Sequence, residues 1–202
     1  MERNRRILIV DDQQDLREQL AKLLARSGKK SSTQSLVQQM RSRLLGADAG
    51  AGEDSDTEPS YYVDTAGQGQ EGYELVRAAV EQGRPYAVMF LDMRMPPGWD
   101  GMETAKRIRE VDRNLEIVIM TAYADHDQKE IAETVGVPEK LLYIKKPFQA
   151  EEIHQLALSL SAKWTMEQAE VARRQALEVM IRGMSRIKTA GLGGVEECHQ
   201  ST

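Results

Sequence analysis

The sequence predicts an α/β fold built around a doubly wound, five-stranded parallel sheet, followed by one long helix. Four short apolar runs rich in β-branched residues, and a shorter run at 61–63, alternate with helical patterns along the chain. Runs of this kind are typical of strands that are buried on both faces of a parallel sheet. Such strands are joined by right-handed crossovers, and ligands bind at their carboxyl ends. After the fifth run, a helical pattern continues without proline for more than 30 residues.

The first run, Ile7–Val10, predicts a strand, and leucines at helical spacing predict a helix over Asp15–Arg26 that faces the sheet. Further strands are expected over 61–63, 86–91, 115–120 and 141–145. Helices are expected over 70–82, 102–111 and 128–135, and from about residue 150 onward. Glycine and proline end several of these elements, with Gly83 after the second helix and Pro147 after the fifth strand.

Two segments depart from this alternation. Residues 27–60 contain a short amphipathic stripe at 36–45 and a small, acidic stretch at 46–59, which predicts a partly flexible insertion. The last helix runs through Trp164 and Leu177 towards Ile187, a length typical of coiled-coil pairing or of a connector. We therefore expect a domain over 1–160, and an extended helix with a disordered tail over 161–202.

Composition excludes several classes of protein. The 202 residues carry a formal net charge of -5, which disfavours direct nucleic-acid binding because that requires a basic face. The single cysteine, Cys198, excludes an intrachain disulfide framework. No apolar run is long enough for a signal peptide or a membrane span, so a cytoplasmic location is expected.

Polar residues follow four of the predicted strands and can form one site. Asp11 and Asp12 follow the first strand, Asp92 the third, Thr121 the fourth and Lys146 the fifth. Three carboxylates at one sheet edge repel one another unless a cation neutralises them, and oxygen ligands beside a phosphoryl group favour Mg²⁺. Lys146 and Thr121 would supply a positive charge and a hydroxyl donor to phosphoryl oxygens. These groups therefore predict phosphoryl transfer, with a carboxylate as nucleophile.

At these positions the chain resembles the receiver domains of two-component response regulators. The matching segments are ILIVDD (7–12), LDMRMP (91–96), MTAY (120–123) and YIKKPF (143–148). The resemblance implies the strand order 2-1-3-4-5, phosphorylation of Asp92 by a histidine kinase or phosphotransfer protein, and catalysis limited to the domain's own phosphorylation and dephosphorylation. It also implies a role for each site residue. Mg²⁺ would be held by Asp11, Asp12, Asp92 and the backbone carbonyl of Arg94. Thr121 and Lys146 would bind the phosphoryl group, and Tyr143 would change rotamer on activation.

Two features depart from that family's usual pattern. Asp12 and Asp92 are 80 residues apart, about twice the usual separation, and residues 27–60 account for the excess. The loop PPGWDG after Arg94 is one residue longer than is common, and its Trp99 either shields the site or contacts a partner.

Three alternative functions remain open. A phosphatase using Asp92 as nucleophile usually has a second acid two residues later, where this chain has Arg94. The second alternative is an interaction module that does not switch. The third is the N-terminal receiver part of a larger hybrid sensor kinase or nucleotide-signalling enzyme. The long C-terminal helix would also allow a homodimer in any of these cases.

Overall fold

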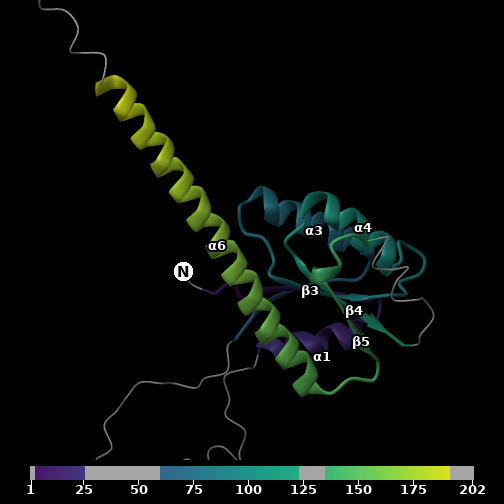
Figure 1. The fold of residues 1–202 in the computed structure, drawn as a ribbon. Helices are drawn as coiled ribbons and strands as arrows, with labels where there is room; N and C mark the ends of the chain where they lie inside the picture. Colours follow the sequence, from purple (N-terminus) through teal and green to yellow (C-terminus); the bar gives the residue numbers. More distant parts are fainter. Residues whose placement is uncertain (1–2, 26–59, 123–134, 192–202) are drawn as a thin grey trace, which may run out of the picture. The chain divides into compact units, whose positions relative to one another are not determined.

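A computed structural model describes residues 3–25, 60–122 and 135–191, with side chains up to residue 182. Its centre is a five-stranded parallel sheet in the order β2-β1-β3-β4-β5, which confirms the predicted fold class and strand order (Figure 1). The strands are β1 (Arg6–Val10), β2 (Tyr62–Ala66), β3 (Val88–Asp92), β4 (Glu116–Thr121) and β5 (Leu141–Lys145).

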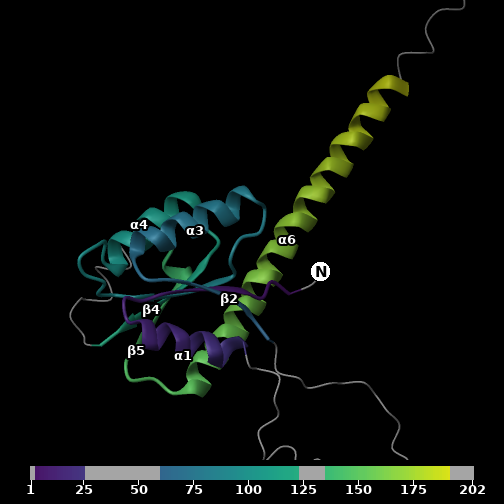
Figure 2. The ribbon, with the colours of Figure 1, turned by 180° about the vertical axis from the view of Figure 1, so that it is seen from behind.

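Helices cover both faces of the sheet. They are α1 (Gln14–Ala25), α3 (Gly69–Glu81), α4 (Gly101–Val111) and α6 (Ala150–Gly191), with a short 3₁₀ helix, η1 (Pro138–Lys140), before β5. Figures 1 and 2 show α3 and α4 on one face, and α1 and the first turns of α6 on the other. Several predicted features lie outside the described residues: the amphipathic stripe at 36–45, the acidic stretch at 46–59 and the tail from 192. The predicted helix at 128–135 also lies outside them, apart from its last residue.

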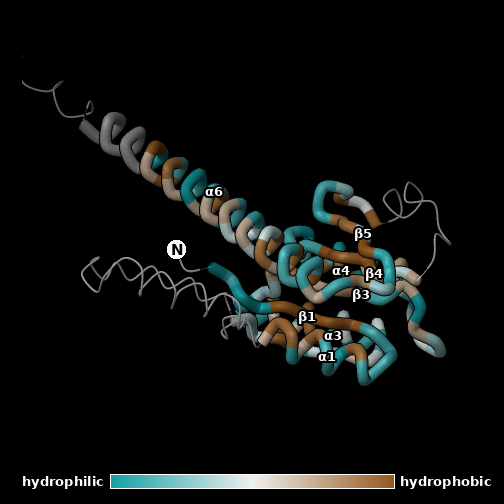
Figure 3. The backbone as a smooth tube through the Cα atoms, turned by 90° about the horizontal axis from the view of Figure 1, so that it is seen from below, coloured by the Kyte–Doolittle hydropathy of each residue, from teal (hydrophilic) through white to brown (hydrophobic). Residues whose placement is uncertain are grey.

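The core forms two layers, one on each face of the sheet. Successive residues of a strand point to opposite faces, so Leu8 packs with the layer under α3 and α4, and Ile9 with the layer under α1 and α6. Figure 3 shows the hydrophobic residues concentrated along the strands. β1, β3 and β4 are almost completely buried, as their apolar runs predict.

The predicted second strand, 61–63, is wrong in its bounds. The structure has β2 at Tyr62–Ala66, where Tyr62 is 73% exposed and Asp64 and Thr65 are also exposed. β2 is an edge strand paired only with β1. The backbone of β2 forms hydrogen bonds with one neighbouring strand, and few of its side chains are buried. This strand is therefore held by backbone pairing and does not need an apolar sequence.

The last helix is longer than the sequence predicts. α6 has 42 residues and continues through Gly183 without interruption. The described chain divides into one compact unit over Arg3–Trp164 and a second that begins at Thr165. Among the described residues, no helix has the combination of length and apolar character that crossing a membrane requires.

A buried charge cluster lies at the amino end of β4, the end opposite the predicted site. Glu116 is fully buried and accepts hydrogen bonds from the Nζ atoms of Lys140, at 2.9 Å, and Lys163, at 3.1 Å. Lys163 also donates to the carbonyl of Glu139 at 2.7 Å. These bonds join β4, η1 and α6 within the first unit.

Candidate functional site

The register of the sheet brings the predicted site residues to one edge. Leu91 pairs with Val10, so Asp92 on β3 ends level with Asp11, the residue that follows β1. Thr121, the last residue of β4, pairs with Lys145, and Lys146 follows directly. The four polar strand ends therefore meet, although they are separated by up to 135 residues in sequence.

Three carboxylates form the acidic part of this site. One oxygen from each of Asp11, Asp12 and Asp92 lies within 4.8 Å of those of the other two. Asp11 is completely buried and Asp92 is 6% exposed, whereas Asp12 is exposed. The cluster therefore has a buried floor and a solvent-facing side, and its exposed side gives an ion or a phosphoryl group access.

Lys146 is the counter-charge of the two buried acids. Its Nζ donates to Asp11 Oδ2 and to Asp92 Oδ1, each at 2.7 Å. Burial of the ammonium works to lower the pKa of Lys146, but its hydrogen bonds to the two carboxylates outweigh that effect and raise it. The lysine is therefore cationic at neutral pH and holds the two acids together.

Backbone donors orient the second oxygen of each buried acid. The amide of Arg94 donates to Asp92 Oδ2 at 3.1 Å, and the amide of Gln13 donates to Asp11 Oδ1 at 2.9 Å. The pKa of Asp92 is raised, mainly because the carboxyl is buried. The negative charge of Asp11 raises it further, whereas the hydrogen bonds and charge of Lys146 and the hydrogen bond from the Arg94 amide lower it. Asp92 is thus a nearly buried carboxylate whose two oxygens both accept hydrogen bonds.

The remaining predicted residues lie around this centre. Thr121 is half-buried, and its carbonyl accepts a hydrogen bond from the Lys146 amide at 2.7 Å. Tyr143 sits on β5 beside Ile119, half-buried against the core layer under α3 and α4, and burial raises its pKa. Arg94 is exposed immediately beyond β3.

Trp99 in the loop after β3 lies over α3 and α4. Its ring makes an edge contact with Tyr73, at 6.0 Å between centroids, and the guanidinium of Arg107 stacks over it at 4.2 Å. Both contacts are with residues of its own domain, although Trp99 stays partly exposed. The two roles predicted for it, shielding the site and contacting a partner, are not decided by these contacts.

Gly101 is a site-building residue that the sequence reasoning missed. A Cβ at this position would lie 2.4 Å from the carbonyl oxygen of Asp92 and 2.9 Å from the Cα of Met93. The start of α4 therefore packs directly on the backbone that carries Asp92, and only glycine allows this approach. Asp100 caps α4 by accepting a hydrogen bond from the Glu103 amide at 2.8 Å, which starts the helix at Gly101 but does not by itself require glycine there.

Comparison of the sequence with known families and proteins agrees with this geometry. Residues 56–158 match the response regulator receiver domain family. The chain is 37% identical over 92 residues to sporulation initiation phosphotransferase F of Bacillus subtilis, a match covering 42% of this chain and 70% of that protein. It is 32% identical over 93 residues to the uncharacterised transcriptional regulatory protein YkoG of the same organism, covering 46% of this chain and 37% of the relative.

Solved structures share the fold. A CheY-like response regulator receiver domain protein from Methanospirillum hungatei superposes with a TM-score of 0.54 at 16% identity, over 81% of this chain and 98% of that one. A structure described as adenylate cyclase from Rhodopirellula baltica has a TM-score of 0.55 at 20% identity, over 85% and 98% of the two chains. The family match begins at residue 56, so it does not include Asp11 and Asp12. Their position beside Asp92 comes from the register between β1 and β3.

Proposed function

The chain belongs to the response regulator receiver family of two-component signalling, and on that premise we propose that it accepts a phosphoryl group on Asp92 from a histidine kinase or a phosphotransfer protein. The observation that carries this proposal is the pair of 2.7 Å hydrogen bonds from Lys146 to Asp11 and Asp92. They hold a buried carboxylate beside a fixed positive charge and an exposed acid, at the edge where parallel sheets bind ligands.

The proposed chemistry is a single displacement at phosphorus. A carboxylate oxygen of Asp92 forms the new oxygen–phosphorus bond, the bond from phosphorus to the donor's imidazole nitrogen breaks, and that nitrogen keeps the electron pair. Lys146 stabilises the charge on the phosphoryl oxygens, and the Thr121 hydroxyl donates a hydrogen bond to one of them. The domain would catalyse only its own phosphorylation and dephosphorylation, with no turnover of another substrate.

The acidic cluster fits a magnesium ion. Mg²⁺ is bound in proteins through one or two carboxylates, with water and phosphate oxygens completing its shell. Asp11, Asp12 and Asp92 offer oxygens within 4.8 Å of one another, and the carbonyl of Arg94 follows Asp92 closely. When bound, the ion would supply positive charge against the transferred phosphoryl group.

Phosphorylation would then shift the population between two conformations of the domain. In the phosphorylated state Thr121 moves towards the acyl phosphate, and Tyr143 changes rotamer into the space this opens. Thr121 and Tyr143 lie on the adjacent strands β4 and β5, where Tyr143 pairs with Ile119 and Thr121 pairs with Lys145. This proximity supports a coupled movement of the two side chains. We expect the surface that changes to include β5 and the start of α6, together with the predicted helix at 128–135, which apart from its last residue lies outside the described residues.

We assign a second copy of the chain as partner of α6. Within the described part of its second unit, Leu177, Met180 and Ile181 recur at a spacing of three or four residues and are 49–64% exposed. This spacing places them on one helix face, which a parallel helix of another copy would bury. Light scattering should show a dimer that Met180→Glu dissociates, while Gln175→Glu, an exposed position on the opposite side of the same helix, serves as a matched control.

Intact mass spectrometry after incubation with acetyl phosphate and Mg²⁺ tests the phosphoacceptor. We expect a phosphate-sized mass gain in the wild type, none in Asp92→Asn, and an unchanged gain in Asp15→Asn, which removes an exposed acid at the start of α1. Circular dichroism must show that Asp92→Asn is folded. The same gain in Asp92→Asn, or no gain in the wild type with either acetyl phosphate or a phosphorylated histidine kinase, contradicts the proposal.

A further inference from the structure

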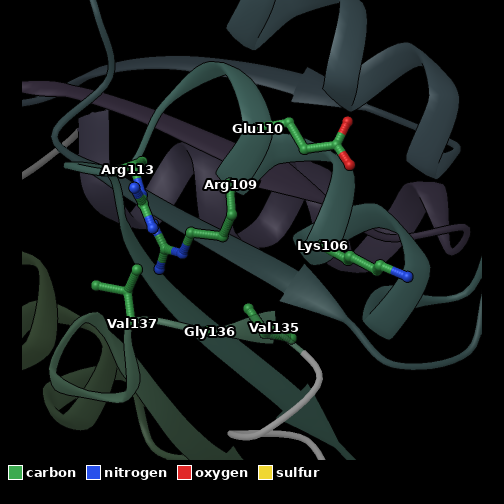
Figure 4. Close-up of a pocket in the computed structure, with 7 residues that line it drawn as sticks. All are labelled: Lys106, Arg109, Glu110, Arg113, Val135, Gly136 and Val137. Atoms are coloured by element: carbon green, nitrogen blue, oxygen red, sulfur yellow. The ribbon is translucent and has the colours of Figure 1, made fainter.

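A pocket of about 350 Å³ lies on the flank of α4 and shares no residue with the phosphoacceptor site (Figure 4). One wall is the second half of α4 and the residues that follow it, and the other is the segment 135–137. Three cations, Lys106, Arg109 and Arg113, line it together with one carboxylate, Glu110. The pocket therefore carries a formal balance of two positive charges.

Two of the three cations lie on α4 and the third follows it. Lys106 and Arg109 are three residues apart on the helix and so share a face, and Arg113 lies two residues beyond the helix end, after the extended Asp112. Figure 4 shows Arg109 and Arg113 extending in the direction of Val137, whereas the carboxylate of Glu110 points away from them. Within the described residues, neither Lys106 nor Arg113 makes an ion pair. Lys106 and Arg113 are therefore the cations that a ligand can reach, whereas Asp112, Glu116 and Glu139 act on the buried Arg109.

Arg109 forms the buried base of this charge. It is 6% exposed, and its two Nη atoms donate to the carbonyls of Leu115, at 2.5 Å, and Lys140, at 2.8 Å. Its Nε is also buried and has no hydrogen-bond partner among the described residues. Burial lowers the pKa of Arg109 to about 10, so the guanidinium is still cationic at neutral pH. An unpartnered donor on a buried cation is rare in folded proteins.

The opposite wall is unusual in its backbone. Gly136 and Val137 both have positive φ, of 66° and 58°. A β-branched residue in this region is strained, and such residues cluster where ligands are held. The side chains of Val135 and Val137 add apolar surface facing the cations.

We propose that this pocket binds a small phosphate monoester with an apolar or aromatic body, no larger than a mononucleotide. A phosphate monoester carries about two negative charges at neutral pH, which matches the formal charge of the pocket. Guanidinium groups bind phosphate oxygens in pairs, and the valines accept the uncharged part of the ligand. The volume is at the lower end of the roughly 300–1,000 Å³ of ligand pockets, which suits a ligand of this size.

Titration of the full, ¹⁵N-labelled chain with adenosine 5′-monophosphate in the absence of Mg²⁺ tests this. We expect saturable shifts of the amides of residues 106–113 and 135–137, and none with adenosine, which lacks the phosphate. Arg113→Gln removes an exposed cation without touching the core and should weaken binding about tenfold. Arg77→Gln, which removes an exposed arginine of α3 outside the pocket, should leave the affinity unchanged.

Asp92→Asn separates this site from the phosphoacceptor. Binding should persist in that variant whether or not Asp92 accepts phosphoryl groups, so failure of the proposed function leaves this test intact. Equal shifts with adenosine, equal affinity in Arg113→Gln and the wild type, or loss of binding in Asp92→Asn would each overturn the proposal.

Discussion

Replacing Lys146 by methionine should strongly destabilise the chain when no divalent cation is present. Lys146 Nζ lies 2.7 Å from an oxygen of each buried acid, and its side chain is 16% exposed. At an effective dielectric constant of about 20, each pair corresponds to about 6 kcal/mol of attraction, most of which is offset by desolvation. Removing one partner leaves the fully buried Asp11 and the nearly buried Asp92 as unpaired like charges. Breaking a buried pair in this way costs about 3–5 kcal/mol.

Urea denaturation with and without Mg²⁺ measures this effect, with Lys106→Met as the matched control. Lys106 is an exposed lysine of α4, and its replacement should change the free energy of unfolding by less than about 0.5 kcal/mol. Mg²⁺ should stabilise Lys146→Met more than the wild type, because the cation binds the folded state and replaces the lost positive charge. If both variants lose equal stability, or if Mg²⁺ stabilises the wild type more, Lys146 is not the counter-charge of this cluster.

Three further changes test the surroundings of the site by urea denaturation. Gly101→Ala should destabilise the fold by about 3 kcal/mol, because its Cβ would overlap the Asp92 carbonyl, whereas Gly67→Ala meets only ordinary contacts and should cost less than about 1 kcal/mol; equal losses would refute the close approach. Glu116→Gln should cost about 3 kcal/mol, because two lysine ammonium groups lose their buried anionic partner; a loss below about 1 kcal/mol would show that the cluster is not structural. Burial raises the pKa of Asp112 above its usual 3.8, because it disfavours the charged carboxylate. The stability that the protonated group contributes is fully present below pH 3.8 and is lost as the pH rises through the pKa of the folded state. Asp112→Asn should therefore gain stability relative to the wild type between pH 4 and pH 7, and a difference that does not change with pH would contradict this.

The sequence predicted much of the fold because most of this sheet is buried on both faces. β1, β3 and β4 have continuous apolar runs, and each polar residue that follows marks the carboxyl end of its strand. The same logic failed at β2, since an edge strand does not need an apolar sequence. It also missed Gly101, because the approach of α4 to the Asp92 backbone is a contact between elements that local sequence does not record.

By itself, therefore, the sequence determined which residues end the strands, and so which side chains are available for phosphoryl chemistry. Hydrophobic periodicity is local, and strand ends can be read from it directly. The tertiary structure alone decided how those side chains meet, with Lys146 bonded to acids 54 and 135 residues away. It also decided that Arg109, one of several arginines in an ordinary helical pattern, is buried beside a pocket. Burial and partner distance depend on how separate elements pack, and no local pattern contains that information.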